Sequence, residues 1–368
     1  MAAKRKHYVS LGLASLYDDL DSTSNDAESS NNVTKLADND NNDNDDDKVL
    51  SAKKLKEDMK SDMAERFNAS NLGAACSKML LSVCGWRKGE REEMQDAHSL
   101  HDHFDVAVND VKRCAFYAIF DGHAGRNAAD YAAKYLPEKL RRKLSNCFDL
   151  VSIEKSMKKI FIETYKQIDE QFLIEARKIR PSWKDGTTAT TIIIINDTVY
   201  CANIGDSKAV VCRSKSPGTF LPLQLTVDHS PIHFEERMRI QKAGGNVKDG
   251  RVMGILEVSR SIGDGQFKAY GVICTPDVKK FSITLDDRFI IMACDGLWKS
   301  FSSQEAVEFV IKKVEELKVV SKPADKDSLD DPRYSLWEKV ADQLAAESVK
   351  RGCGDNVSVI IILLSEML

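Results

Sequence analysis

The sequence lacks the features that mark several common classes of protein. No apolar stretch approaches the length of about 20 residues that a membrane-spanning helix needs. The nine cysteines include no Cys-x-x-Cys pair, which argues against a disulfide framework and fits a reducing compartment. No cysteine is followed six residues later by arginine, so a thiol-based phosphate loop is absent. The formal net charge of −4 gives no indication of nucleic-acid binding.

Residues 1 to about 70 are predicted to form an N-terminal tail. The run DNDNNDNDDDK at 38–48 is almost pure Asp and Asn, so it cannot bury apolar area and predicts disorder. It also lacks the glycine and distal glutamate of an EF-hand calcium loop. The basic triplet KRK at 4–6 is too short to establish nuclear import, so we expect a cytoplasmic protein and leave a nuclear fraction open.

From about Cys76 onward, apolar runs alternate with helical patterns in an order that is neither strictly βα nor all-β. The dipeptide Asn196-Asp197 joins two apolar runs and predicts a hairpin, which implies antiparallel pairing. We therefore predict an α+β fold of antiparallel sheets covered by helices over residues 71–368. The predicted strands lie at 116–120, 190–195, 199–204, 209–212, 288–294 and 358–364, and the predicted helices lie at 126–144, 154–179, 234–245, 303–317 and 335–352.

Acidic residues recur at the ends of the predicted strands. Because strand ends meet at the rims of a sheet, acids from distant positions can converge there. Converging carboxylates repel one another, and a hard divalent cation with oxygen ligands removes that cost. Without a cysteine or histidine cluster to suggest zinc, the pattern predicts Mg²⁺ or Mn²⁺, with more than one ion. The acids and their polar neighbours are Arg91, Asp96, Asp121, His123, Asp206, Asp264, Asp295 and Asp355.

Each of these motifs also has an ordinary structural interpretation. Asp-Gly, Asp-Ser and Asp-Asn pairs mark turns. Arg91 alone is typical of a surface charge, and His123 alone is typical of a core or rim histidine. Asp264 could tie down a loop beside Arg260. The recurrence of the acids, with an arginine and a histidine beside them, favours a metal-dependent hydrolase.

Eight segments, taken together, resemble the metal-dependent type 2C protein serine/threonine phosphatases. They occur in the order of that family and span nearly everything from about residue 85 onward. The stretch from Glu235 to Lys268 is most similar to the integrin-linked kinase-associated subgroup of the family. The segments are EREEMQDAH (90–98), FDGHAG (120–125), DGTTAT (185–190), NIGDSKAVVC (203–212), LTVDHSP (225–231), VSRSIGD (258–264), ACDGLW (293–298) and GDNVSV (354–359).

The resemblance implies a sandwich of two antiparallel sheets flanked by helices, with two metal ions at one end and a mobile flap at about 226–262. It implies hydrolysis of phosphoserine and phosphothreonine by a water that bridges the two ions, without a phosphoenzyme. Asp121 matches the carboxylate that bridges both ions, and Gly122 matches a carbonyl ligand. The remaining matches are Asp295 and Asp355 as ligands of the other ion, Asp96 near the metals and their waters, Arg91 as the phosphate-binding arginine and His123 as the general acid.

Three positions depart from the pattern of the family. Gln95 stands where many members carry glutamate, and Ala124 replaces a common glycine. Lys299 stands where many relatives carry an acid that, with the match to Asp206, is associated with a third metal site. The third ion is therefore in doubt, and Lys299 could either pair with Asp206 or point into solvent.

Two rival functions are also consistent with the sequence. A pseudophosphatase would use the fold to bind partners without turnover, although the intact set of acids argues against it. A hydrolase of non-protein phosphates would use the same metals. For a phosphatase we expect phosphoserine and phosphothreonine proteins as partners, a kinase-signalling complex as a setting, a monomeric state, and no nucleic acid or membrane.

Overall fold

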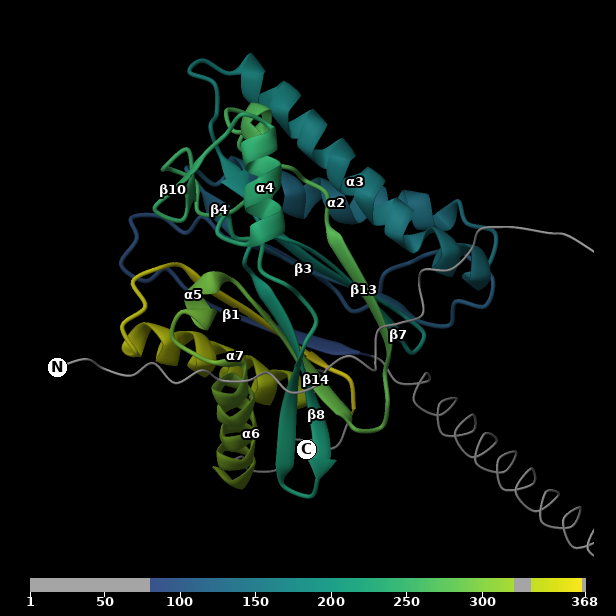
Figure 1. Ribbon diagram of the computed structural model, residues 1–368. Helices are drawn as coiled ribbons and strands as arrows, with labels where there is room; N and C mark the ends of the chain where they lie inside the picture. The colour runs from purple at the N-terminus through teal and green to yellow at the C-terminus, as the bar shows by residue number, and fades with distance from the viewer. Residues whose placement is uncertain (1–79, 321–331, 366–368) are drawn as a thin grey trace, which may run out of the picture. The chain divides into compact units, whose positions relative to one another are not determined.

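Two five-stranded antiparallel sheets form the centre of the computed structural model, which describes residues 80–320 and 332–365 (Figure 1). The first sheet contains, in spatial order, β1 (Leu81–Arg87), β15 (Val357–Leu363), β14 (Asp287–Ala293), β8 (Lys208–Ser216) and β9 (Thr219–Gln224). The second sheet contains β13 (Asp277–Ser282), β7 (Thr198–Ile204), β6 (Ala189–Ile195), β3 (Cys114–Phe120) and β2 (Ala97–His101).

Helices cover the outer faces of both sheets. The second sheet is covered by α2 (Asn127–Ser145) and α3 (Leu150–Lys178), and the first by α6 (Ser303–Val320) and α7 (Pro332–Lys350). The short α5 (Asp295–Trp298) follows β14 directly. The remaining elements are β4 (Gly122–His123), β5 (Gly186–Thr187) and β12 (Ile262–Gly263), which form a small sheet, the pair β10 (Val247–Lys248) and β11 (Arg251–Val252), α4 (Phe234–Lys242) and the 3₁₀ helix η1 (Lys268–Tyr270).

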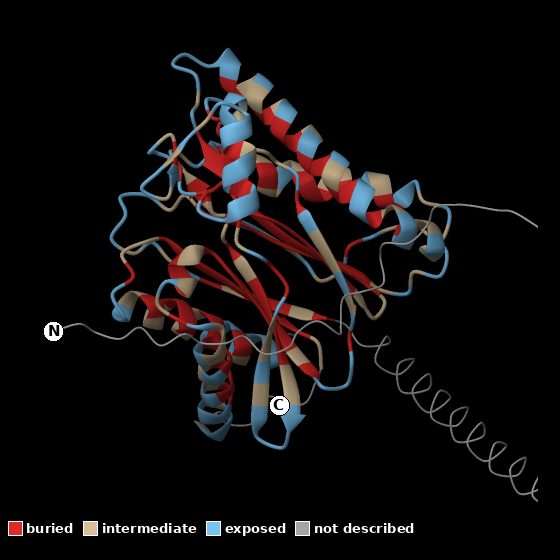
Figure 2. Ribbon diagram, in the orientation of Figure 1, coloured by how far each residue is buried: buried red, intermediate tan, exposed pale blue. Residues whose placement is uncertain are grey.

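The alternation of side chains along the strands explains why the molecule has these layers. In β3, Phe116, Ala118 and Phe120 belong to the core beneath α2 and α3, whereas Tyr117 and Ile119 belong to the core between the two sheets. The other central strands divide in the same way, so both faces of each sheet are buried (Figure 2). This double burial accounts for the continuous apolar runs in the sequence.

The predicted α+β sandwich of antiparallel sheets flanked by helices is confirmed. Asn196 and Asp197 form the predicted hairpin turn, since Ile195 pairs with Thr198. All six apolar runs form strands, and all five helical patterns form helices. The sequence patterns missed the edge strands β1, β2, β9 and β13, in which polar and apolar residues mix.

The ends of the central strands that bear functional candidates lie at one rim of the sandwich. Antiparallel pairing sets the carboxyl ends of β3 and β14 beside the amino ends of β2 and β15, because Phe120 pairs with Ala97 and Ala293 pairs with Val359. The acids that flank these strands therefore meet at that rim.

Along the described part of the chain, no helix is both long and apolar enough to cross a membrane. The predicted tail, residues 1 to about 70, lies outside the described residues, so the domain boundary stays a prediction.

The segment between β9 and β13 packs over one side of this rim and includes the predicted flap at 226–262. A small apolar cluster that includes Ile240, Val252 and Phe267 holds its turns together. Its main polar anchor is Glu236 on α4, which is 4% exposed and accepts hydrogen bonds from Arg239 and Arg260 at 2.7–3.2 Å. Burial alone would raise the pKa of Glu236, but these hydrogen bonds hold that pKa well below its ordinary value.

Replacing Glu236 by glutamine is expected to lower the free energy of unfolding at pH 7 by about 2–3 kcal/mol, because two partly buried arginines lose a charged partner. A depressed pKa stabilises the fold above the unfolded pKa of glutamate, and the effect fades as pH falls. The difference from wild type should thus be full above about pH 5 and shrink below about pH 4. Urea unfolding across this range measures it. Glu235→Gln, on the exposed side of α4, is the control, and equal stability of both variants would contradict the role of Glu236.

Candidate active site

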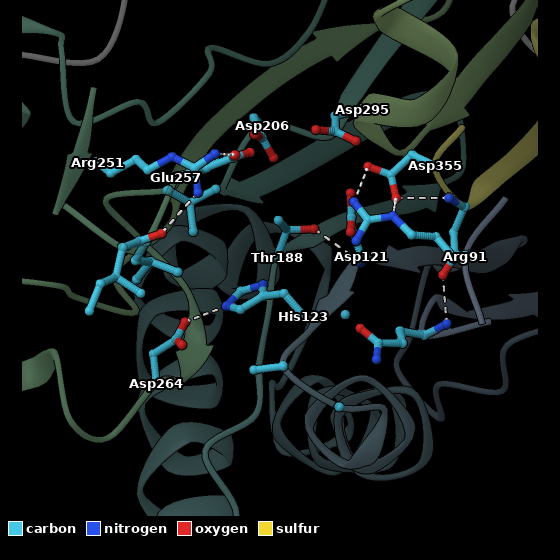
Figure 3. Close-up of a pocket in the computed structure, with 18 of the residues that line it drawn as sticks. Arg91, Asp121, His123, Thr188, Asp206, Arg251, Glu257, Asp264, Asp295 and Asp355 are labelled. Carbon is cyan, nitrogen blue, oxygen red and sulfur yellow. Dashed lines mark hydrogen bonds and ion pairs between the residues drawn. The ribbon is translucent and has the colours of Figure 1, made fainter. Parts of the chain in front are cut away.

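A cavity of about 930 Å³ opens at the rim where the acids meet (Figure 3). The carboxylate oxygens of Asp121, Asp206 and Asp295 lie within 4.8 Å of one another. Asp355 lines the same cavity. These four acids come from the ends of β3, β7, β14 and β15, so the convergence expected from the sequence is observed.

The crowded carboxylates are costly to keep ionised. Burial and the charges of neighbouring acids raise the pKa of Asp121 well above its ordinary value. Burial and the charge of Asp295 raise the pKa of Asp206 to about 7. Burial also raises the pKa of Asp295, although Lys299 opposes this shift. Oxygen donors at such close range, with unfavourable mutual charge, fit a hard divalent cation.

Two protein cations contact the acids on one side of the cluster. The Lys299 ammonium lies 2.7 Å from Asp295 and 3.0 Å from Asp355. Arg91 contacts both oxygens of Asp355, at 2.9 Å through Nε and 3.0 Å through Nη2. These contacts outweigh the effect of burial and hold the pKa of Asp355 below its ordinary value.

The expectation that Lys299 pairs with Asp206 or points into solvent is therefore wrong. Lys299 follows Asp295 by one helical turn at the end of α5, and this i, i+4 spacing directs its ammonium back to Asp295. Asp206 instead joins Asp121 and Asp295 in the acid cluster. Asp206 is not among the two-ion ligands that the family resemblance implies.

Asp96 and Gly122 lie deeper than the other candidate residues. Gly122 lines the floor of the cavity, whereas Asp96 lies beneath that floor. Asp96 is 4% exposed, does not line the cavity, and accepts a hydrogen bond from Ser358 at 2.8 Å. Burial raises its pKa to about 6, with Asp355 and Asp295 adding to the shift. A carboxylate oxygen of Asp96 lies within 4.8 Å of one from Asp121 and of the Cys294 sulfur. At Gly122, a Cβ would come within 2.2 Å of the Gln95 carbonyl oxygen, so only glycine fits.

His123 faces the cavity from the opposite side to Arg91 (Figure 3). Its Nε2 lies 2.7 Å from Asp264, whose carboxylate also accepts a hydrogen bond from Ser261 at 2.6 Å. A Cβ on Gly186 would lie 2.1 Å from Asp264 and 2.3 Å from His123, so this glycine makes room for the pair. Burial lowers the pKa of His123, but the charge and hydrogen bond of Asp264 outweigh it and the net pKa is raised. Asp264 thus orients the histidine, whereas Arg260 pairs with Glu236 and Asp277.

Two further residues shape the site without having been singled out from the sequence. The Asn356 side chain accepts from the Gln95 N–H at 2.7 Å and donates to the carbonyls of Lys88 and Glu93. It thereby fixes the loop that carries Arg91. Thr188 accepts from the Asp121 N–H at 3.1 Å and lines the cavity. Asn356 belongs to the segment GDNVSV and Thr188 to the segment DGTTAT. Their place in segments that resemble the family was the sequence feature that could have identified them.

Replacing Lys299 by methionine is expected to tighten the binding of Mn²⁺ by about 3–10-fold, because the ammonium competes with a cation for Asp295 and Asp355. The effect is limited to roughly 1 kcal/mol, since the lysine side chain is 49% exposed and solvent screens its charge. Calorimetric titration of chelated protein measures it. Lys280→Met on β13, which breaks the ion pair with Glu154 of α3, is the matched control. Weaker Mn²⁺ binding by Lys299→Met would show that the ammonium supports the site.

Comparisons with known proteins agree with this geometry. The family model described as protein phosphatase 2C matches residues 81–357. The integrin-linked kinase-associated serine/threonine phosphatase 2C of Bos taurus is 44% identical over 294 residues, which cover 78% of each chain. Probable protein phosphatase 2C 67 of Oryza sativa subsp. japonica is 38% identical over 314 residues, which cover 80% of this chain and 78% of the relative.

A similar solved structure supports the fold alone, because its sequence identity is low. The serine-threonine phosphatase 2C from Toxoplasma gondii superposes with a TM-score of 0.62 at 21% identity, covering 77% of this chain and 94% of that chain. The family expected from the eight segments is confirmed by the family model and by the curated relatives. The chain therefore belongs to the protein phosphatase 2C family of metal-dependent protein serine/threonine phosphatases.

Proposed function

We propose that the chain hydrolyses phosphoserine and phosphothreonine in proteins, using Mg²⁺ or Mn²⁺ with two ions per active site. The observation that carries this proposal is the convergence of Asp121, Asp206 and Asp295 in one cavity with Arg91 and His123. Oxygen donors of this kind suit hard divalent cations. The arginine and the histidine supply the anion binding and the proton that ester hydrolysis needs.

The proposed ligands are the carboxylates of Asp121, Asp295 and Asp355 and the carbonyl of Gly122, with Asp96 behind them. When bound, the ions supply an activated water nucleophile and offset the negative charge of the phosphate. Asp206, within 4.8 Å of Asp121 and Asp295, adds a further carboxylate on the same side. Phosphate-monoester hydrolysis is among the slowest uncatalysed reactions, so its catalysis requires strong stabilisation of the transition state.

Arg91 is placed to bind the phosphate. Its side chain is 60% exposed and stands at the cavity wall, between β1 and β2. The guanidinium fork that spans both oxygens of Asp355 matches two oxygens of a phosphate in the same way. Rotation of this long side chain towards a bound phosphate would offset charge on the transferring group.

His123 is placed to protonate the leaving group. Its Nε2 is engaged by Asp264, which leaves Nδ1 without a protein hydrogen-bond partner among the described residues. Asp264 raises the pKa of His123 and so favours protonation at Nδ1, from which a proton can pass to the serine or threonine oxygen. Gly186 keeps the space that this geometry requires.

The pseudophosphatase alternative receives less support from the site. A binding module has no need to preserve the acid cluster, the phosphate-binding arginine and the oriented histidine together.

Two relatives, from Bos taurus and Homo sapiens, carry names that associate them with integrin-linked kinase. By this similarity we propose that the present chain acts in a kinase-signalling complex, and we place it in the cytoplasm with a nuclear fraction open.

The proposed substrate class is tested by phosphate release from matched peptides and small phosphates in the presence of Mn²⁺. One peptide sequence is prepared with phosphoserine, phosphothreonine or phosphotyrosine, and a sugar phosphate and a nucleotide are assayed beside it. We expect kcat/KM for the phosphoserine and phosphothreonine peptides to exceed that for the small phosphates by at least about 10-fold, since a peptide can make more contacts with the flap residues that line the cavity. Preference for a small phosphate would overturn the substrate class, and binding of phosphopeptide without turnover would support the pseudophosphatase.

A further inference from the structure

A second, smaller cavity of about 310 Å³ opens beside the active-site cavity. The two cavities share Arg91, Lys299 and Asp355 in their walls. The rest of the smaller cavity is formed by Ser300 and by the turn that follows α7, residues 351–354. No step of the proposed hydrolysis uses this turn.

The wall of the smaller cavity is predominantly cationic. Its charged residues are Arg91, Lys299 and Arg351 against one acid, Asp355. Asp355 already accepts hydrogen bonds from both Arg91 and Lys299, and it is one of the proposed metal ligands. Arg91 and Lys299 are thus paired with Asp355, and Lys299 with Asp295 as well, so Arg351 is the cation of this wall that an incoming anion can contact without competing with a proposed metal ligand.

Arg351 is the charged residue that belongs to the smaller cavity alone. Its guanidinium packs 3.6 Å over the Phe301 ring and donates to the Ser300 carbonyl at 3.2 Å, which fixes its position. Glu305 forms an ion pair with Nη1 at 3.5 Å and Glu347 with Nε at 3.6 Å, and neither acid lines the cavity. Nη2 has no hydrogen-bond or ion-pair partner among the described residues, so its two N–H donors are available for an anion.

The end of α7 does not oppose an anion at this place. Helix C-termini are unfavourable to negative charge because of their unpaired carbonyls. Here the carbonyls of Glu347, Ser348 and Val349 accept hydrogen bonds from the N–H groups of Arg351, Cys353 and Gly352. The turn therefore satisfies these carbonyls, and the side-chain charges decide what the cavity binds.

We propose that the smaller cavity is an anion subsite that binds an acidic or phosphorylated side chain of the substrate, near the phosphoresidue that is hydrolysed. The inference rests on the proposed phosphatase function and narrows its substrates to acidic or multiply phosphorylated segments. Because Arg91 and Lys299 line both cavities, the second anion lies close to the first. An extended chain advances about 3.4 Å per residue, so the two anions are separated by about one to three residues.

The subsite is tested with a set of phosphothreonine peptides that differ only at one position from −3 to +3 around the phosphothreonine. That position is alanine, glutamate, phosphoserine or lysine, and all assays run at one ionic strength. We expect at least one position at which glutamate or phosphoserine raises kcat/KM about 5–10-fold over alanine for dephosphorylation of the phosphothreonine itself, followed by mass spectrometry; this is the range of one good charged contact. Preference for phosphoserine alone would assign the subsite to phosphate, and preference for both would assign it to anions in general.

Variants of Arg351 locate the effect. Arg351→Gln is expected to abolish the preference while leaving kcat/KM for the alanine peptide within about twofold of wild type, since this residue does not line the active-site cavity. Arg351→Lys should retain part of the preference, and Arg351→Glu should shift it towards the lysine peptide. Lys350→Gln removes the same charge from the neighbouring position, which is 79% exposed and outside the cavity wall. Melting curves establish that each variant is folded.

Three results would overturn the inference. Wild-type protein that hydrolyses every peptide equally would refute the subsite and leave the phosphatase function standing. An equal loss of preference in Lys350→Gln and Arg351→Gln would assign the preference to general surface charge. Hydrolysis of no peptide at all would remove the proposed function, and the subsite with it.

Discussion

Replacing Asp121 by asparagine is expected to lower kcat/KM for a phosphothreonine peptide by at least about 10³-fold, a loss of roughly 4 kcal/mol of transition-state stabilisation. The amide preserves the shape of the side chain at the end of β3 but removes the charge at the centre of the acid cluster. Initial rates of phosphate release at fixed Mn²⁺ measure the effect. Asp130→Asn, on the exposed side of α2 and outside the cavity, should keep wild-type activity.

The same variant separates a metal ligand from a residue that merely shapes a turn. Asp121, Asp206 and Asp295 repel one another when no cation lies between them, so the asparagine variant should melt at a higher temperature than wild type after chelation. Added Mn²⁺ should stabilise wild type much more than the variant. Loss of stability in the chelated variant, or full activity with Mn²⁺, would contradict the assignment of Asp121 as a ligand.

Replacing Arg91 by alanine is expected to lower kcat/KM by about 10²-fold, the usual cost of removing one charged donor to a transferring phosphate. Its affinity for Mn²⁺ should stay within about threefold of wild type or tighten slightly, because the guanidinium competes for Asp355. Steady-state kinetics and calorimetry measure the two quantities separately. Arg142→Ala, an exposed arginine on α2, is the matched control. Loss of the metal ions from Arg91→Ala would contradict its role as a phosphate donor.

The layers of the fold were predictable because the central strands are buried on both faces. The runs at 192–195 and 359–363 are apolar without interruption, which only a doubly covered sheet requires. The edge strand β13 reads DVKKFS and mixes exposed and half-buried positions. Such a strand is defined by its pairing with β7 rather than by its own pattern, so the sequence alone could not reveal it.

The acids of the site were predictable for a related reason, whereas their partners were not. A carboxylate at the end of a buried strand has few places to lie other than the rim. The pairing of His123 with Asp264 joins positions 141 residues apart, and it depends on how β4, β5 and β12 assemble into the small sheet. The contact between Lys299 and Asp295 depends on α5, which begins at Asp295. Because Lys299 follows Asp295 by one helical turn, its ammonium returns to the Asp295 carboxylate.

The measurement that tests the proposed mechanism most directly is phosphate release from a phosphothreonine peptide by protein freed of metal by chelation. Metal content is determined on the same sample by elemental analysis. We predict less than about one-hundredth of full activity before addition of metal, and recovery on adding Mn²⁺ or Mg²⁺ with about two ions bound per chain. Full activity from protein shown to contain no divalent metal would contradict the assignment of Asp121, Asp295 and Asp355 as the ligands on which catalysis depends.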